Sequence, residues 1–283
     1  MPDYLEFKRI GIIGVGVVGG ALRAYLESRG IKPLLYDPGL GLGSAIEVDA
    51  ADLVFACVPT PYQPGSGFDD SIMRGAIAAL SGSKTIVIKS TVLPGTTDSI
   101  QGDYPQHRIL FNPEFLRENS ALEDFVRPDR QIVGYARRWD AETARAVLRL
   151  LPRASFESVM PARSAELIKY ATNAFLALKV TFANELFDLA CALDADYELV
   201  RAGLAADARI GPSHLDVHDS GYRGYGGKCL PKDTMALLDL ARQVGAPIRV
   251  LETAHAVNSE LRGEAILHDL AAGGAPLKDA LAA

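Results

Sequence analysis

The stretch Arg-Ile-Gly-Ile-Ile-Gly-Val-Gly-Val-Val-Gly-Gly, residues 9–20, decides the fold of this 283-residue chain. A short apolar strand leads into a glycine-rich turn with the spacing Gly14-x-Gly16-x-x-Gly19, and a helical pattern follows over residues 21–29. Gly14 permits a tight turn, Gly16 lets the backbone approach a pyrophosphate, and Gly19 allows the helix to pack against the strand. The stretch therefore predicts the start of a dinucleotide-binding βαβ unit.

An acidic residue ends the next predicted strand, residues 33–36. Asp37 stands 18 residues after the last glycine of the turn, where a carboxylate accepts hydrogen bonds from ribose hydroxyls and repels a 2′-phosphate. The cofactor expected is therefore NAD rather than NADP. The N-terminus of the following helix offers N–H groups and a positive dipole to the pyrophosphate, and Val17 and Val18 of the turn are candidate cofactor contacts. A glycine-rich turn that binds no nucleotide is the alternative interpretation.

Further apolar strands at residues 52–58, 84–89 and 108–111 predict a parallel sheet covered by helices on both faces. Helical patterns occupy residues 71–80 and 140–150, and residues 152–160 predict the last edge of the sheet. Ligands of such sheets bind at the carboxyl ends of the strands, so Pro59, Thr60 and Thr91 are expected on the cofactor side. The fold class is α/β, with an N-terminal Rossmann-type doubly wound sheet over residues 1–160.

One long helix over residues 164–193 opens an all-α domain predicted for residues 161–260. Its length suggests a scaffold for this domain and a dimer surface. Lys169 and Asn173 are four residues apart and so share a face, where they line a pocket or form a polar ladder on the surface. Helices follow at residues 197–206, 234–245 and 252–270. Residues 261–283 are assigned to a C-terminal tail, of which 271–283 are expected to fray.

The segment Gly-Tyr-Gly-Gly-Lys-Cys-Leu-Pro-Lys-Asp, residues 224–233, is the strongest candidate for chemistry. A cysteine after two glycines and before charged residues suits a nucleophilic thiolate at Cys229. A glycine-rich turn with a buried cysteine is the alternative. Cys57 lies in a predicted strand and Cys191 in a predicted helix, so both are interpreted as packed core thiols.

Two carboxylates, Glu114 and Glu118, follow the predicted strand at residues 108–111. On a short helical turn, residues four apart project on one side, toward a common cleft. Glu114 is a candidate base. A solvated helix start, with Glu118 paired to Arg117 or Arg127, is the alternative.

Composition restricts the classes of function. The chain is 48% hydrophobic, with a net charge of −6 and a pI near 5.4, which argues against a nucleic-acid binder. Its three cysteines suggest neither a disulfide framework nor a metal site, and they suit a reducing cytoplasm. The N-terminus lacks the apolar region of a signal peptide, and the apolar run at residues 11–22 is too short to span a bilayer. No membrane partner is expected.

Taken together, the motifs resemble the UDP-glucose/GDP-mannose dehydrogenase family, in family order over about residues 8–258. They are the glycine-rich turn; Val58-Pro59-Thr60-Pro61; Ser90-Thr91-Val92 with Pro94-Gly95-Thr96; Asn112-Pro113-Glu114-Phe115-Leu116-Arg117-Glu118; Pro128-Asp129-Arg130; Lys169 with Asn173; and Gly226-Gly227-Lys228-Cys229-Leu230-Pro231-Lys232-Asp233.

The resemblance implies two successive NAD-dependent oxidations that take the primary alcohol of a nucleotide-linked hexose to a carboxylate, with UDP-glucose as the default substrate. By match to the family motifs, the implied catalytic residues are Cys229 as nucleophile, Lys169 and Asn173 for the oxyanion, Asp233 and Thr91 for positioning water, and Glu114 as base. The candidate cofactor-binding residues are Gly14, Gly16, Val17, Val18, Gly19, Asp37, Pro59, Thr60, Thr91 and Glu118. The candidate substrate-binding residues are Glu114, Phe115, Leu116, Lys169, Asn173, Arg209, Tyr225, Gly226 and Gly227.

Two departures from the family pattern concern the substrate. Longer members continue into a third, nucleotide-binding domain, whereas this sequence stops soon after Asn258. Residues 209–214 resemble the loop from which an arginine, here Arg209, reaches the neighbouring subunit's site, and residues 215–223 make the loop longer than usual. The alternatives are a dehydrogenase of another hydroxymethyl compound, such as a different nucleotide or nucleoside, and a non-catalytic NAD-binding partner subunit.

Overall fold

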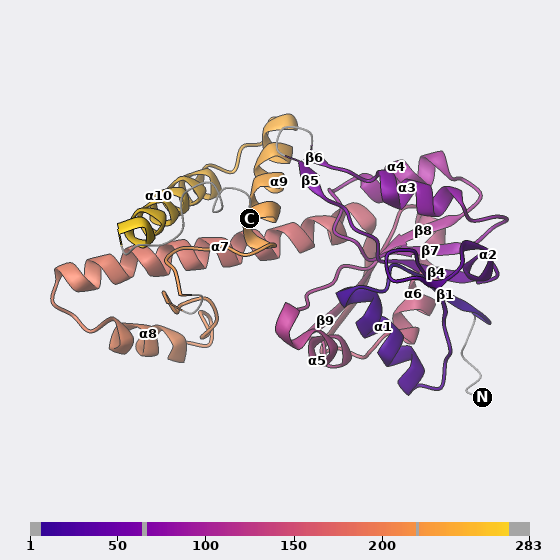
Figure 1. The fold of residues 1–283 in the computed structure, drawn as a ribbon, viewed down its shortest axis with the longest axis horizontal. Helices are drawn as coiled ribbons and strands as arrows, with labels where there is room; N and C mark the ends of the chain where they lie inside the picture. Colours follow the sequence, from indigo (N-terminus) through magenta and orange to yellow (C-terminus); the bar gives the residue numbers. More distant parts are fainter. Residues whose placement is uncertain (1–6, 64–66, 219–220, 272–283) are drawn as a thin grey trace. The chain divides into compact units, whose positions relative to one another are not determined.

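The computed structural model of this chain describes residues 7–63, 67–218 and 221–271 (Figure 1). The chain divides into two compact units, the first ending at Lys169 and the second beginning at Tyr170. Each unit contains hydrophobic clusters of its own. Of the tail that the sequence predicts to fray, only Ala271 lies within the described residues, and the first six residues of the chain lie outside them.

An eight-stranded sheet forms the centre of the first unit, in the order β10-β9-β8-β7-β4-β1-β2-β3. The predicted α/β fold with a Rossmann-type sheet is confirmed. The five strands β2, β1, β4, β7 and β8 are parallel neighbours, so their carboxyl ends share one edge. The strands are β1 (Ile10–Ile13), β2 (Leu34–Asp37), β3 (Leu42–Gly43), β4 (Leu53–Ala56), β7 (Thr85–Ile88), β8 (Arg108–Phe111), β9 (Arg130–Tyr135) and β10 (Phe156–Pro161).

The parallel pairing predicted for the central strands is confirmed, and antiparallel pairs occur toward both sides of the sheet. β3 pairs with β2 in antiparallel register, because a four-residue turn joins them and leaves no room for a crossover. β9 is antiparallel to β8, and β10 is parallel to β9. The connection from β8 to β9 therefore stays at the carboxyl edge instead of returning across the sheet. A short separate hairpin, β5 (Tyr62–Gln63) with β6 (Gly67–Phe68), follows β4.

Helices cover both faces of the sheet, as Figure 1 shows for α3 and α4 on one side and α1 and α5 on the other. Side chains of β4 alternate between the two resulting cores: Leu53 and Phe55 belong to one, Val54 and Ala56 to the other. The first core takes residues of α1 (Val17–Ser28), α5 (Ala121–Val126) and α6 (Ala141–Leu150). The second takes residues of α2 (Ala45–Val48), α3 (Ser71–Ala78) and α4 (Thr96–Asp103).

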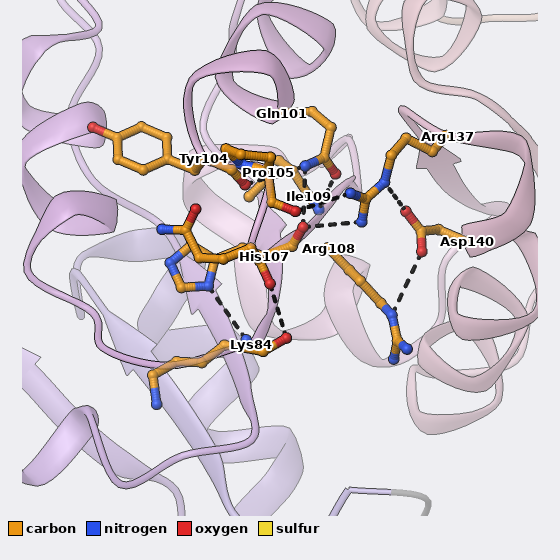
Figure 2. A network of polar contacts seen from close by, with 11 residues as sticks. Lys84, Gln101, Tyr104, Pro105, His107, Arg108, Ile109, Arg137 and Asp140 are labelled. Carbon is orange, nitrogen blue, oxygen red and sulfur yellow. Dashed lines mark hydrogen bonds and ion pairs between the residues drawn. The ribbon is translucent and has the colours of Figure 1, made fainter.

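A buried polar network closes the amino end of β8, opposite the edge that carries the glycine-rich turn (Figure 2). Gln101 donates to the carbonyl oxygens of Tyr104 and His107 and accepts from the Ile109 N–H. Arg137 donates to the His107 carbonyl oxygen and pairs with the buried Asp140. Nearly every polar group of this turn is thus bonded inside the protein, which gives the network a structural role.

The long helix α7 (Ala162–Ala192) confirms the helix predicted at residues 164–193. Its first turns are fixed to the first unit by the buried Glu166. The Glu166 carboxylate accepts from the Gly95 N–H at 2.6 Å and from the N–H and hydroxyl of Thr97 at 2.9 and 2.5 Å. Glu166 thereby caps the N-terminus of α4 from outside that helix.

The second unit continues α7 with α8 (Tyr197–Ala206), α9 (Leu230–Gln243) and α10 (Arg249–Ala271). A small core joins Ala183 and Ala190 of α7 to Tyr197, Leu215 and Val217. Helix α9 begins at Leu230, four residues before the predicted start, because Pro231 suits the first turn of a helix. Among the described residues, no helix is both long enough and apolar enough to cross a membrane.

The interpretation of Cys191 as a core thiol is wrong. Its neighbour Ala190 is buried, but Cys191 lies one position further around α7 and is exposed. Cys57 packs at the margin of the first core, as expected, and burial raises the pKa of its thiol to about 12.

Candidate functional site

The glycine-rich turn has the geometry that its spacing predicts. Gly14 has φ +84°, and a Cβ there would lie 2.5 Å from the Cys57 carbonyl oxygen. A Cβ on Gly19 would lie 1.9 Å from the Gly14 carbonyl oxygen, so the helix packs directly on the turn. Gly16 differs, because a Cβ at this position would meet nothing within 4 Å. The backbone is therefore bare at Gly16, where a pyrophosphate approaches.

Helix α1 begins at Val17, with Gly16 as an N-cap that makes no side-chain bond. The N–H groups of Val17 and Val18 precede the first intrahelical bond, from the Gly20 N–H to the Gly16 carbonyl oxygen at 2.7 Å. Together with the helix dipole, these groups form an anion site. The residues present fit the phosphates of a dinucleotide.

Asp37 ends β2, where the sequence predicts it. One carboxylate oxygen accepts from the Val15 N–H at 2.7 Å and the other from the Leu40 N–H at 3.1 Å. Asp37 therefore anchors the glycine-rich turn, a role that its sequence position did not suggest. An ionised carboxylate has about four acceptor sites, so these two bonds leave capacity for ribose hydroxyls.

Thr60 and Thr91 follow β4 and β7 at the same edge. The Thr60 hydroxyl donates to the Thr91 carbonyl oxygen at 2.7 Å, and Ser90 donates to the Val58 carbonyl oxygen at 2.6 Å. These bonds tie the two strand exits together. The Thr60 hydroxyl thus already donates its proton within the protein. Pro59, beside it, is exposed.

Glu114 and Lys169 form an ion pair, with 2.7 Å between Oε1 and Nζ, and both side chains are mostly buried. The other Glu114 oxygen accepts from the Leu116 N–H at 2.9 Å. Burial alone would raise the pKa of Glu114, but the charge and hydrogen bond of Lys169 outweigh burial and hold that pKa below its usual range. Phe115 lies against two cations, 3.8 Å from Arg130 and 5.8 Å from Lys169.

The prediction that Glu114 and Glu118 share a helical turn is wrong. Residues 112–117 are irregular, because Pro113 disfavours helical backbone at Asn112 and the Asn112 amide is bonded within the sheet. Glu118 opens a short 3₁₀ helix, Glu118–Ser120, and its side chain lies outside the described part of the structure. Arg117 pairs with Asp124.

The second unit holds the cysteine loop. Cys229 is exposed at the N-cap of α9, and its carbonyl oxygen accepts the first helical bond, from the Asp233 N–H. The buried Asp233 carboxylate accepts from the Asn173 amide at 2.6 Å, and its other oxygen lies 3.6 Å from Lys232 Nζ. The structure thus brings Asn173 of α7 to the first turn of the helix that Cys229 begins.

The remaining candidate residues differ in burial and in what they contact. Tyr225 is buried: its backbone exchanges two bonds with the Asn258 amide, and its hydroxyl contacts His255 at 2.9 Å. Gly226 leaves space for the Tyr222 ring, since a Cβ would lie 2.5 Å from the Tyr222 hydroxyl oxygen, and Gly227 has φ +73°. Arg209 is exposed and pairs with Asp207 in its own loop.

Two residues that sequence reasoning missed hold the cysteine loop. Arg223 binds the side chain and carbonyl oxygen of Asn184 and pairs with Asp188, both on α7. Asn258 supplies the two bonds to Tyr225 from α10. Only the adjacency of Arg223 to the glycine-rich segment was a signal in the sequence.

A Rossmann-type sheet with a bare, glycine-rich turn before a helix defines a dinucleotide-binding protein. Comparison with known families adds that residues 42–151 match the NAD binding domain, and residues 163–260 the central domain, of the UDP-glucose/GDP-mannose dehydrogenase family. The chain belongs to this family.

Comparison with curated proteins gives the same family. The chain is 38% identical over 249 residues to the UDP-glucose 6-dehydrogenase of Rhizobium meliloti (strain 1021), covering 82% of this chain and 55% of that protein. It is 32% identical to the UDP-glucose 6-dehydrogenase TuaD of Bacillus subtilis (strain 168), covering 90% and 64%. The chain therefore spans less than two thirds of the length of these relatives.

Solved structures show the same fold. A UDP-glucose dehydrogenase from Pyrobaculum islandicum superposes with a TM-score of 0.73 and 31% identity, covering 92% of this chain and 70% of that one. A UDP-D-ManNAc dehydrogenase from Pyrococcus horikoshii has a TM-score of 0.76 at 20% identity, covering 89% and 68%, and shows the fold alone.

Two glycines of the turn predict distinct effects. Gly16→Ala should leave the free energy of unfolding within about 1 kcal/mol of wild type, because its Cβ meets no protein atom, yet weaken NAD binding at least about tenfold. Gly19→Ala should destabilise the fold by about 2 kcal/mol or more, since its Cβ would overlap the Gly14 carbonyl. Denaturant unfolding and calorimetric titration with NAD measure both quantities. Unchanged NAD affinity in Gly16→Ala would remove the turn from the cofactor site.

Proposed function

We propose that this protein catalyses the NAD-dependent, four-electron oxidation of the primary alcohol of a nucleotide sugar to the carboxylate, with UDP-glucose as the first substrate to test. Membership of the dehydrogenase family supports the proposal. The observation that carries it is Cys229, exposed at the N-terminus of α9, with Asp233 of the first turn bound to Asn173. A two-electron alcohol dehydrogenase has no use for a thiol in such a setting.

The proposed chemistry needs a covalent step because an aldehyde is oxidised further most easily as a tetrahedral adduct. NAD, when bound, accepts the hydride in each oxidation. After the first oxidation, the Cys229 sulfur bonds to the aldehyde carbon and gives a thiohemiacetal. Loss of a second hydride and of the hydroxyl proton leaves a thioester. Water then attacks the carbonyl, the C–S bond breaks, and the carboxylate and the thiol are released.

Charged and polar side chains act in both the first and the last steps of this reaction. The helix N-terminus favours negative charge at the cysteine. We propose that the Lys169 ammonium and the Asn173 amide stabilise the oxyanion of the tetrahedral states, as preorganised donors do. Asp233 and Thr91 are proposed to position the attacking water. Glu114 must be ionised to accept a proton from that water, and its lowered pKa keeps it so.

Purified protein with NAD should form NADH with at least one nucleotide sugar, and two NADH should appear for each carboxylate released. A panel of nucleotide sugars and free nucleosides, followed at 340 nm and by mass spectrometry of the products, tests this stoichiometry. A single NADH per product would indicate a two-electron dehydrogenase. NADH from none of the compounds, in protein that binds NAD, would favour the non-catalytic partner subunit.

Replacement of the nucleophile should separate binding from turnover. Cys229→Ser should still bind NAD and substrate but lose acid formation about a thousandfold or more, because an alkoxide is much harder to form near neutral pH than a thiolate. Glu114→Gln should instead accumulate a thioester on Cys229, visible as a mass shift on its peptide, since the water lacks a base. Cys191→Ser, at the other exposed cysteine, is the matched control. Wild-type acid formation by Cys229→Ala would exclude the covalent route.

We further propose that the protein is a homodimer through α7 and acts in a reducing, cytoplasmic setting. Phe175, Phe182 and Leu189 are 63%, 60% and 54% exposed and follow one another at seven-residue spacing, which places them on one face of the helix. An exposed apolar stripe of this kind is typical of a surface that another protein covers.

Light scattering at micromolar concentration should give the mass of a dimer for wild type and of a monomer for Phe175→Glu/Phe182→Glu, because two buried charges per subunit disfavour association. Trp139→Ser, which changes an exposed aromatic side chain outside α7, should stay dimeric. A monomeric wild type would contradict the proposal.

A further inference from the structure

Four residues stand side by side where neighbouring strands of the first unit end. Backbone N–H groups of Cys57, Lys89 and Asn112 donate to the carbonyl oxygens of Ile13, Ala56 and Ile88, so the ladder continues one residue beyond β4, β7 and β8. Gly14, Cys57, Lys89 and Asn112 therefore form a row across the sheet. Lys89 is the unexpected member, because a lysine that is only 3% exposed is rare without an ionic partner.

The Lys89 ammonium is bonded to the residue that precedes the Glu114 segment. Lys89 Nζ donates to Asn112 Oδ1 at 2.5 Å, and the fully buried Asn112 amide donates to Gln131 Oε1 at 2.9 Å and to the Ile132 carbonyl oxygen at 2.7 Å. Asn112 is thus held by β9 on one side and by Lys89 on the other. Two residues later the chain presents the Glu114 carboxylate to Lys169.

The charges around Lys89 also connect this residue with Glu114. The pKa of Lys89 is lowered to about 8, chiefly by burial; the charges of Cys57 and Glu114 oppose this shift, and the charge of Lys169 adds to it. The buried Cys57 thiol, with a raised pKa, is neutral at physiological pH. Glu114 is therefore the carboxylate whose charge acts on the Lys89 ammonium, and the Phe125 ring of α5 lies 5.4 Å from that ammonium.

We propose that Lys89 is a positioning residue for Glu114: it fixes Asn112, and with it the exit of β8 that presents Glu114, and it places a second cation near the carboxylate that Lys169 pairs with. A buried ammonium bonded to a neutral amide costs stability. The effect of the Lys89 ammonium on the Glu114 carboxylate accounts for the presence of this buried charge. The inference rests on the proposed function only where it assigns a reaction step to Glu114.

Lys84 provides a matched control at the other end of β7. It too is a mostly buried lysine: Nζ donates to the carbonyl oxygens of Asp49 and Ala51 at 2.5 and 3.2 Å and lies 3.2 Å from the Asp49 carboxylate. Figure 2 shows Lys84 in the network around His107, at the amino end of β7, whereas Lys89 follows the carboxyl end of that strand. Replacement of either lysine removes one buried cation from the same strand.

The decisive measurement does not depend on activity. Carbon NMR of glutamate side chains, with the Glu114 resonance assigned by its loss in Glu114→Gln, gives the titration midpoint of Glu114 directly. The Glu114 midpoint should shift upward in Lys89→Met and in Lys89→Gln, and should not shift in Lys84→Met. Lys89→Gln keeps a donor for Asn112 and is the variant to use where Lys89→Met does not fold. A folded Lys89 variant with the wild-type midpoint would overturn the proposal.

Kinetics provide the second arm. In Lys89→Gln, the acid limb of the pH profile of kcat/KM should move to higher pH, and kcat should fall about tenfold or more with little change in KM, because the base and not the binding surface is disturbed. Lys84→Met should lower thermal stability without moving the limb. A shifted Glu114 midpoint in protein that oxidises no nucleotide sugar would support the positioning role and contradict the proposed function alone.

Discussion

The register of the parallel strands is the constraint on which the first unit depends. The strands β1, β4, β7 and β8 are followed directly by Gly14, Cys57, Lys89 and Asn112, and the backbone ladder continues across these ends. Because the register is shared, side chains that are 30 or more residues apart in sequence become direct neighbours at one edge. The glycine-rich turn, the threonine-linked exits of β4 and β7, and the Glu114 segment all take their places from this edge.

Buried polar side chains that imitate backbone hold the functional segments. Glu166 caps a helix from a distance, Asn112 bridges β8 to β9, and Asn258 pairs with Tyr225 as a neighbouring strand would. Each supplies hydrogen bonds that irregular segments lack, and an unsatisfied buried group would cost about 1 to 3 kcal/mol. The loops to which we assign the chemistry are therefore fixed by hydrogen bonds without being regular secondary structure.

Features set by local sequence could be predicted, and features set by long-range packing could not. Gly14, Gly19 and Asp37 act within one βαβ unit, so their spacing alone predicted the turn, and the long helix α7 followed from its uninterrupted pattern. The helical turn at Glu114 failed because Asn112 bonds to β9, a strand nearly twenty residues later. The interpretation of Cys191 failed because the sequence of a long helix does not by itself show which of its faces other elements cover.

Lys89 escaped notice for a related reason. A lysine at the end of a predicted strand suggests a side chain that reaches solvent, and only the pairing of β4, β7 and β8 shows that it is covered on both sides. The catalytic assignments of Cys229, Lys169, Asn173, Asp233 and Glu114 stay predictions. What the structure adds is pairing: Glu114 with Lys169, and Asn173 with Asp233.

The double duty of Asp37 restricts how this protein can change over evolutionary time. The carboxylate that would discriminate between the two nicotinamide cofactors is also the acceptor that fixes Val15 in the turn. A substitution of Asp37 that admits a phosphorylated ribose also removes the acceptor of the Val15 N–H. A change of cofactor preference is therefore coupled to a loss of order in the glycine-rich turn. A variant of this protein that accepts the phosphorylated cofactor therefore needs a second acceptor for the Val15 N–H as well as space at the ribose.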